Sequence, residues 1–179
     1  MHKSLVTAGL LLVGTTALAD PPKPADAANP LSQTVTHSYE RVKKFLIGAA
    51  AEMPADQYGF KPTPDVRSFG QLIGHVADTQ MMFCSLAKHD TTAKKPDFEK
   101  TATTKAALQK ALADGFAYCD AVYASTTDAT LTQPVEMFGQ KLTRFAALDI
   151  NVAHDNEHYG NIVTYLRLKK LVPPSSANQ

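Results

Sequence analysis

Apolar residues recur at every third or fourth position in four long stretches of the 179-residue chain. Residues at this spacing share one face of a helix, so the pattern predicts four amphipathic helices. The first helix is expected to begin after Asn29, a favourable cap, with Pro30 at its first position. Its apolar stripe runs to about Met53, and Pro54 ends it.

The second predicted helix, over residues 69–87, carries apolar residues on most of its circumference. Ser68 and Gln71 form a capping box at its start. A helix of this composition is buried on most of its sides. A polar, basic connection over residues 91–102 is expected to follow on the surface.

The third predicted helix is capped by Thr103 or Thr104 and ends at about Ser125. Residues 135–143 then combine strand-forming residues with a central glycine. This pattern is typical of a small β-hairpin, with its turn expected about residues 139–140.

Thr143 is predicted to cap the fourth helix, which runs to about Leu171 and stops before two prolines. Four long helices with apolar stripes indicate an all-α fold, a four-helix bundle with long inter-helix connections. We assign the bundle to residues 31–172 as one domain, followed by a C-terminal tail over residues 173–179. Bundles of this kind build metal sites from inward side chains of facing helices.

The first residues have the pattern of a cleaved signal peptide. Lys3 precedes an apolar run to Val13 that is too short to span a bilayer, and an A-x-A sequence ends at Ala19. We therefore expect residues 1–19 to be a signal peptide and residues 20–30, rich in proline and alanine, to be a flexible tether. The mature protein is then exported to the periplasm or the extracellular space.

The charge distribution argues against two classes of partner. The formal net charge is +1, and the basic residues are scattered along the chain. This distribution gives no indication of nucleic-acid binding or of a polybasic membrane-binding segment. We expect no membrane span in the mature chain. A small-molecule substrate or ligand is compatible with the sequence, and so is a homodimer, because such bundles often pair through a helix face.

Two histidines four residues apart are the first candidates for chemistry. His154 and His158 lie on the inward stripe of the fourth predicted helix, so both imidazoles face the same point. This is a common way to hold a zinc-like ion, although the spacing alone also fits two core histidines hydrogen-bonded to other side chains. His75, in the middle of the second predicted helix, is by itself more typical of a core histidine. We expect His37 to be solvated and His89 to be a favourable cation at a helix C-terminus.

Residues 60–77, FKPTPDVRSFGQLIGHVA, together with the HxxxHxG sequence at residues 154–160, resemble the DinB/YfiT-like family of bundle proteins. The resemblance covers nearly the whole mature chain. In that family, one histidine of the second helix and an HxxxH pair of the fourth helix hold a divalent metal ion. The resemblance therefore implies that His75, His154 and His158 bind one divalent ion, zinc or nickel.

The resemblance also implies a kind of chemistry. Some relatives are metal-dependent transferases or isomerases that use a low-molecular-weight thiol, and others have no known activity. Three neutral imidazoles leave an ion its full charge and an open position, where bound water or thiol becomes nucleophilic near neutral pH. We expect an exported metal-binding protein with metal-dependent transferase or hydrolase activity. The alternative is a non-catalytic metal or small-molecule binding protein, or a stress protein, in which the metal is structural.

Other residues near the histidines allow further interpretations. The sequence HDNEH at residues 154–158 also fits an inverted zinc-protease signature with Glu157 as general base, but residues 159–179 contain no acidic third ligand. Asp78, one turn after His75, is a candidate fourth ligand, a residue that orients a histidine, or simply a polar residue at a helix interface. Four further residues are expected either to line a solvent-open pocket on this face or to fill the core: Thr79, Met82, Asn151 and Tyr165.

Cys84 and Cys119 are the only two cysteines, and they lie on the second and third predicted helices. Cys84 follows His75 by nine residues, so it faces away from the predicted metal site. In an exported protein we expect the two to form a disulfide, with two independent buried thiols as the alternative. Closing the intervening loop would stabilise the fold by about 4 kcal/mol in the chain-entropy model.

Overall fold

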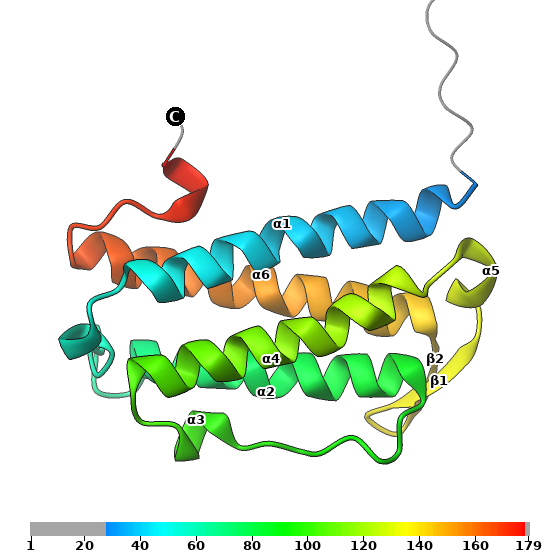
Figure 1. Ribbon diagram of the computed structural model, residues 1–179, viewed down its shortest axis with the longest axis horizontal. Coiled ribbons are helices and arrows are strands. Elements are labelled where there is room, and N and C mark those ends of the chain that lie inside the picture. Colours follow the sequence, from blue (N-terminus) through cyan, green and yellow to red (C-terminus); the bar gives the residue numbers. More distant parts are fainter. Residues whose placement is uncertain (1–27, 178–179) are drawn as a thin grey trace, which may run out of the picture.

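The computed structural model describes residues 28–177, which form one bundle of four long helices (Figure 1). The long helices are α1 (Pro30–Glu52), α2 (Phe69–Lys88), α4 (Lys105–Ala124) and α6 (Arg144–Leu168). The shorter elements are η1 (Ala55–Gln57), α3 (Phe98–Thr101), α5 (Asp128–Leu131), β1 (Pro134–Met137), β2 (Gln140–Thr143) and η2 (Pro174–Ser176). The predicted four-helix bundle, with a small hairpin before the last helix, is confirmed.

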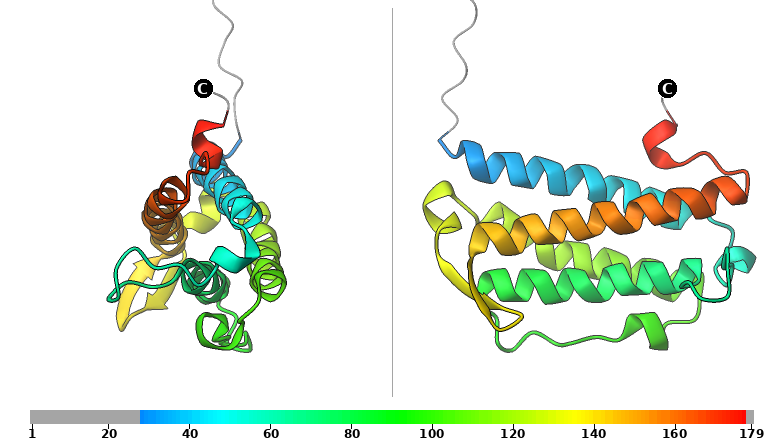
Figure 2. Two further views of the ribbon diagram at one scale, coloured as in Figure 1. Left: turned by 90° about the vertical axis from the view of Figure 1, so that its left-hand side faces the viewer. Right: turned by 180° about the vertical axis from the view of Figure 1, so that it is seen from behind.

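Each long helix packs against two of the others. α2 contacts α4 and α6, and α1 contacts the same two helices. α1 and α2 therefore lie diagonally opposite each other, as the end-on view in Figure 2 shows. The hairpin of β1 and β2 lies at one end of the bundle against α2 and α6, and α3 packs on the outside of α2 (Figure 1). The neighbouring faces of α2 and α6 position the site described below.

Three of the long helices begin at the predicted capping residues. The side chains of Ser68, Thr104 and Thr143 each accept a hydrogen bond from a backbone N–H three residues further on. The Gln71 side chain in turn accepts a hydrogen bond from the Ser68 backbone N–H and completes the predicted capping box. These local signals fix where α2, α4 and α6 start.

The start of α1 is capped from another part of the chain. Asn29 occupies the cap position, as predicted, but its side chain makes no capping bond to its own helix. Instead, the Asp128 carboxylate accepts from the backbone N–H groups of Leu31 and Ser32. The Asn29 side chain in turn accepts from the Asp128 backbone N–H, so α1 and the short helix α5 cap each other.

The hairpin turn lies one residue earlier than predicted. Its two central residues are Phe138 and Gly139, with φ angles of 52° and 76°. A two-residue turn with positive φ at both positions follows the natural twist of the strands. This register buries Val135 and Met137, each 1% exposed, and a one-residue slip would turn both of them outward.

The two cysteines form a disulfide between α2 and α4. The Cα atoms of Cys84 and Cys119 are 5.4 Å apart, and both residues are fully buried in the core. The predicted signal peptide and residues 20–27 of the predicted tether lie outside the described residues. Within residues 28–177, no helix is both long and apolar enough to cross a membrane.

The last helix ends earlier than about Leu171, where it was predicted to stop. α6 ends at Leu168 because Lys170 adopts a left-handed conformation with a φ of 62°. The chain then turns back over α1, and the Ser175 backbone N–H donates to the Tyr159 hydroxyl over 2.9 Å. Tyr159 therefore helps to hold this C-terminal turn in place.

Candidate metal centre

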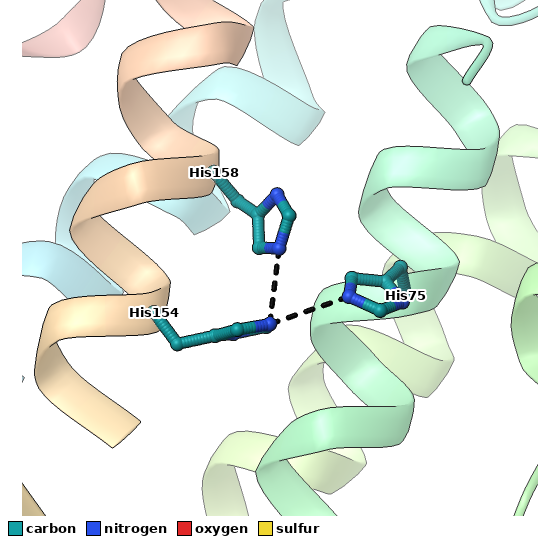
Figure 3. Close-up of side chains that lie close together, drawn as sticks. All are labelled: His75, His154 and His158. Atoms are coloured by element: carbon teal, nitrogen blue, oxygen red, sulfur yellow. Dashed lines mark hydrogen bonds between the residues drawn. The ribbon is translucent and has the colours of Figure 1, made fainter. Parts of the chain in front are cut away.

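Three histidines from two neighbouring helices meet at one point of the bundle (Figure 3). His75 comes from the middle of α2, and His154 and His158 come from successive turns of α6. Nε2 of His154 lies 3.0 Å from Nε2 of His158 and 3.3 Å from Nε2 of His75. Each residue offers one ligand atom within 4.8 Å of the others, so the group could hold a metal ion. The structure thus brings together all three residues singled out in the sequence; we call them the histidine cluster.

The histidine cluster lies at the edge of the core. His158 is only 7% exposed, whereas the side chain of His75 is 21% exposed. His154 is also partly exposed, so solvent reaches the histidine cluster past His75 and His154. A surface groove of about 970 Å³ lies elsewhere, between α1 and the C-terminal turn, and none of the three histidines lines it.

The donor set fits a divalent cation chemically. Nδ1 of His75 is 2.9 Å from a Glu99 carboxylate oxygen, which favours a proton on Nδ1 and leaves the Nε2 lone pair facing the histidine cluster. With Nε2 of His75 unprotonated, the single Nε2 of His154 cannot make a good hydrogen bond to both neighbouring Nε2 atoms, so without a cation at least one of the two contacts is left without a hydrogen bond. Nδ1 of His154 and of His158 are also buried with no hydrogen-bond partner among residues 28–177. A cation among the Nε2 atoms would remove their repulsion and offset the cost of these unmatched nitrogens.

The surroundings keep two of the histidines neutral. Burial, followed by the charges that His158 and His75 would carry, lowers the pKa of His154 to about 4. Burial and then His75 also lower the pKa of His158 below its ordinary value. Both rings are therefore neutral near pH 7, which is the form of imidazole that coordinates metals.

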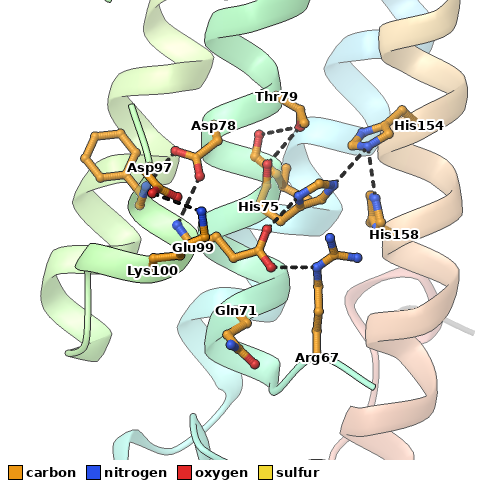
Figure 4. Close-up of polar contacts among 12 residues, drawn as sticks. Arg67, Gln71, His75, Asp78, Thr79, Asp97, Glu99, Lys100, His154 and His158 are labelled. Carbon is orange, nitrogen blue, oxygen red and sulfur yellow. Dashed lines mark hydrogen bonds and ion pairs between the residues drawn. The ribbon is translucent and has the colours of Figure 1, made fainter. Parts of the chain in front are cut away.

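A carboxylate that the sequence patterns did not indicate orients the third histidine. Glu99, from the short helix α3, contacts His75 through one oxygen and accepts from Nε of Arg67 through the other, over 2.8 Å (Figure 4). Burial alone would raise the pKa of Glu99, but the hydrogen bond and charge of Arg67, followed by those of His75, lower it overall. The ionised carboxylate thus holds the orientation of the His75 ring.

Two residues of α2 hold α3 in place. The Asp78 carboxylate accepts from the backbone N–H groups of Phe98 and Glu99, over 2.7 and 3.0 Å. A Cβ atom at Gly74 would lie 2.7 Å from the Glu99 backbone, so only glycine allows this approach. Asp78 is thus not a fourth ligand; it positions Glu99, which in turn contacts His75.

The residues predicted to line a pocket have different roles. The Thr79 hydroxyl bonds to the carbonyl groups of its own helix, and Asn151 is fully buried and donates to Gln80 and Tyr123. The Tyr165 hydroxyl donates to the Arg67 carbonyl oxygen. For Thr79 and Asn151 the pocket interpretation is therefore wrong and the core interpretation is right, because helical spacing specifies a face but not which neighbour a side chain meets.

The other candidates lie away from the histidine cluster. His37 and His89 are exposed, as expected for residues that are not ligands. Glu157 is also exposed, on the outer side of α6, where a general base for the protease interpretation would be misplaced. Within residues 28–177, His75, His154 and His158 are the group of histidine, cysteine or acidic side chains arranged to hold a metal.

Comparison with known proteins identifies related chains. A model of the DinB superfamily matches residues 38–162. The chain is 25% identical over 142 residues to the uncharacterized protein YjoA of Bacillus subtilis strain 168, a match that covers 76% of this chain and 88% of YjoA.

Solved structures share the fold at lower identity. A DinB-like protein from Bacillus cereus ATCC 10987 has a TM-score of 0.69 at 16% identity, covering 79% of this chain and 95% of the other. The DinB-like protein YjoA from Bacillus subtilis has a TM-score of 0.60 at 19% identity, covering 77% and 92%. A conserved protein from Enterococcus faecalis has a TM-score of 0.61 at 18% identity, covering 76% and 95%. At these identities the likeness extends to the fold alone.

Proposed function

This chain belongs to the DinB superfamily, and we propose that it is a metalloprotein whose His75, His154 and His158 hold one divalent ion, zinc or nickel. The observation that carries the proposal is the convergence of three Nε2 atoms, two of them on rings kept neutral by burial. Three nitrogen ligands are the number that catalytic zinc sites use, whereas structural zinc sites are usually closed by four protein ligands.

We propose metal-dependent transfer or hydrolysis as the chemistry. A bound ion of this kind supplies a Lewis acid and an acidified water or thiol at its open position. The chain's own residues prepare that position: Glu99 fixes the His75 ring, and the 21% exposure of the His75 side chain leaves a route for a small molecule. Charged Arg67 lies at the same edge, against Glu99.

A second candidate function is a structural metal. The ligands come from α2 and α6, so an ion there would also cross-link two helices of the bundle. A non-catalytic binding or stress protein would need no more than this. The two functions differ in whether a water or thiol occupies the coordination sphere.

We also propose that the protein is exported. The signal-peptide pattern of residues 1–19 supports this proposal, and so does the disulfide between Cys84 and Cys119. Disulfides of this kind persist in oxidising compartments and are rare in the cytosol.

The test of catalysis is a screen of the metal-loaded protein against thiol-transfer and ester or amide hydrolysis substrates. We expect turnover that is lost in His154→Ala and kept in His37→Ala, whose side chain is exposed and remote from the histidine cluster. X-ray absorption of the loaded protein should show one light-atom ligand beyond three imidazoles. Absence of turnover, together with a coordination sphere filled by protein atoms, would favour the structural function.

A further inference from the structure

Arg67 is an arginine held in place beside the histidine cluster, and only one of its five N–H donors, that of Nε, is used. Its Nε donates to Glu99 over 2.8 Å, and its backbone carbonyl accepts from the Tyr165 hydroxyl over 2.6 Å. The side chain is nevertheless 43% exposed. Within residues 28–177, neither terminal guanidinium nitrogen has a hydrogen-bond acceptor. Figure 4 shows these two nitrogens on the same side as His75 and His158.

This arrangement is suited to a carboxylate. The two terminal N–H groups of a guanidinium match the two oxygens of a carboxylate, and such paired hydrogen bonds are stronger than neutral ones. Because Glu99 already holds the guanidinium of Arg67, and Tyr165 holds its backbone, a ligand has less of this side chain to order. Glu99 accepts only from Nε of Arg67, so the two terminal nitrogens of the guanidinium remain available to a ligand.

Two aromatic rings lie on the His154 side of the histidine cluster. The ring of Phe83 lies 5.4 Å from the ring of His154, and the ring of Phe138 lies 6.3 Å from that of Phe83. Phe83 is buried, whereas Phe138 is 69% exposed at the tip of the hairpin.

Phe138 occupies a turn position that glycine or asparagine fills more readily than a bulky residue. Its φ of 52° is in the left-handed region, which is rare for bulky side chains and suits glycine. A large apolar ring is therefore held in water, at a conformational cost, near one side of the histidine cluster. The turn itself requires this φ, so the notable feature is that a large, exposed apolar side chain occupies the position.

We propose that the site binds a small organic acid that carries an apolar group, with its carboxylate on Arg67 and its apolar part toward Phe138 and Phe83. The inference deepens the proposed function, on which it rests for the metal ion between these two contacts. It names the class of substrate: charge at one end, an aromatic or branched hydrocarbon at the other, and the reacting atoms beside the histidines.

The experiment is calorimetric titration of the full chain, in its cobalt-loaded and metal-free forms, with three probes. They are 3-phenylpropionate, propionate, which lacks the ring, and 3-phenylpropanol, which lacks the charge. We expect 3-phenylpropionate to bind at least tenfold more tightly than either other probe. Metal content is measured separately on every sample, and thermal unfolding checks that each variant is folded.

Two variants test the two contacts. Arg67→Gln should lower the affinity for 3-phenylpropionate at least tenfold and leave the affinity for 3-phenylpropanol unchanged. The exposed Arg41→Gln is the control. Phe138→Gly removes the ring and suits the positive φ of this position. It should lower the affinity for 3-phenylpropionate at least threefold and leave the affinity for propionate unchanged. Leu168→Ala is the exposed apolar control.

Equal affinity of the wild type and Arg67→Gln for 3-phenylpropionate overturns the inference, and so does equal affinity of the wild type for 3-phenylpropionate and propionate. A failure of the proposed function looks different. If the protein takes up no metal but its metal-free form binds 3-phenylpropionate through Arg67 and Phe138, the metalloprotein proposal falls and the acid-binding site stands.

Discussion

Two neighbouring polar regions lie at the interface of α2 and α6, the second of them extending to α4, and they differ in how their polar groups are paired. The first is the histidine cluster, in which like groups face one another. The second comprises Gln80, Tyr123, Asn151 and Asp155, which we call the amide network. Asp155 follows His154 directly in the sequence, yet it is fully buried and belongs to the second region.

The amide network joins complementary groups. The Gln80 side chain donates to Asp155 and accepts from Asn151, which also donates to the Tyr123 hydroxyl. Tyr123 in turn donates to the Leu148 carbonyl oxygen. Burial raises the pKa of Asp155 well above its ordinary value, and the opposing hydrogen bond from Gln80 does not cancel this effect. Oδ1 of Asn151 and Oδ2 of Asp155 are buried without a hydrogen-bond partner in the described part of the chain, but every side chain of the amide network makes at least one complementary hydrogen bond.

The contrast separates a structural polar region from a functional one. Each side chain of the amide network has at least one partner of the opposite kind, so this region stabilises one packing of the helices. The histidine cluster has three acceptors and no donor common to them, which is an arrangement that calls for a cation. Changes in the amide network should therefore alter stability, and changes in the histidine cluster should alter metal binding.

The largest change in stability should come from the disulfide, which belongs to neither region. Replacing both Cys84 and Cys119 by alanine opens a link across 35 residues and should lower the free energy of unfolding by about 4 kcal/mol. Urea unfolding of the wild type and the double variant measures this difference. Metal stoichiometry should be unchanged, since the disulfide joins α2 to α4 and not to α6. Loss of metal together with the disulfide would show that binding merely follows overall stability.

The next largest effect should come from the amide network. Asn151→Ala leaves Gln80 Oε1 without its donor inside the core and should cost about 2 kcal/mol of unfolding free energy. Asn161→Ala, at an exposed position of the same helix, should cost much less. Urea titration and metal analysis of both variants are the measurements. A variant at Asn151 that stays as stable as the wild type would contradict the structural role of the amide network.

A smaller effect is expected at the carboxylate that orients His75. Glu99→Gln removes the charge facing Nδ1 and should weaken metal binding about 10- to 100-fold, as for other residues that orient a metal ligand. The exposed Glu157→Gln is the matched control and should leave the affinity unchanged. Competition with a chromophoric chelator gives the metal dissociation constants of both variants. Equal affinities for the two variants would remove Glu99 from the account of the site.

The smallest effect is the pH dependence of the unfolding free energy of the metal-free protein. The two regions contribute to it with opposite sign. Because the pKa of His154 falls from 6.5 to about 4 on folding, the unfolded chain binds more protons between these values. The histidine cluster thus makes stability fall as pH drops through this window. The raised pKa of Asp155 does the reverse: its contribution is complete below about 3.8 and is lost as pH rises toward the folded-state pKa.

The variant Asp155→Asn separates the two contributions. Without the opposing carboxyl, stability should rise more steeply between pH 4 and 6.5 than it does in the wild type. Urea unfolding at several pH values in the presence of chelator gives the slopes. A shallower slope in Asp155→Asn would mean that this carboxyl is ionised in the folded protein.

Local patterns were sufficient to predict most of the fold and to single out His154 and His158, whereas His75 was assigned to the site through the family resemblance. The capping residues and the spacing of His154 and His158 act within one helix, where sequence distance and spatial distance agree. Glu99 was not predicted because it reaches His75 from 24 residues away, through a helix of one turn in a polar connection. Its position depends on tertiary packing of α3 against Gly74. The motif contains that glycine, but periodicity does not reveal what approaches it.

The amide network shows a second limit of periodicity. Asn151 lies on the inward stripe with His154 and His158, and in the sequence the three look equivalent. In the structure Asn151 meets Gln80 and Tyr123, because the choice of partner depends on how α2, α4 and α6 pack around it.

The most direct test of the central claim is the metal content of the purified protein after exhaustive dialysis, measured by inductively coupled plasma mass spectrometry. The account predicts one divalent ion per chain in the wild type and in His37→Ala, and none in the triple variant His75→Ala/His154→Ala/His158→Ala. Circular dichroism shows whether the triple variant keeps its helices. Stoichiometric metal in a folded triple variant would contradict the claim that the three histidines bind the ion. So would a wild type that cannot be loaded with zinc or nickel at pH 7.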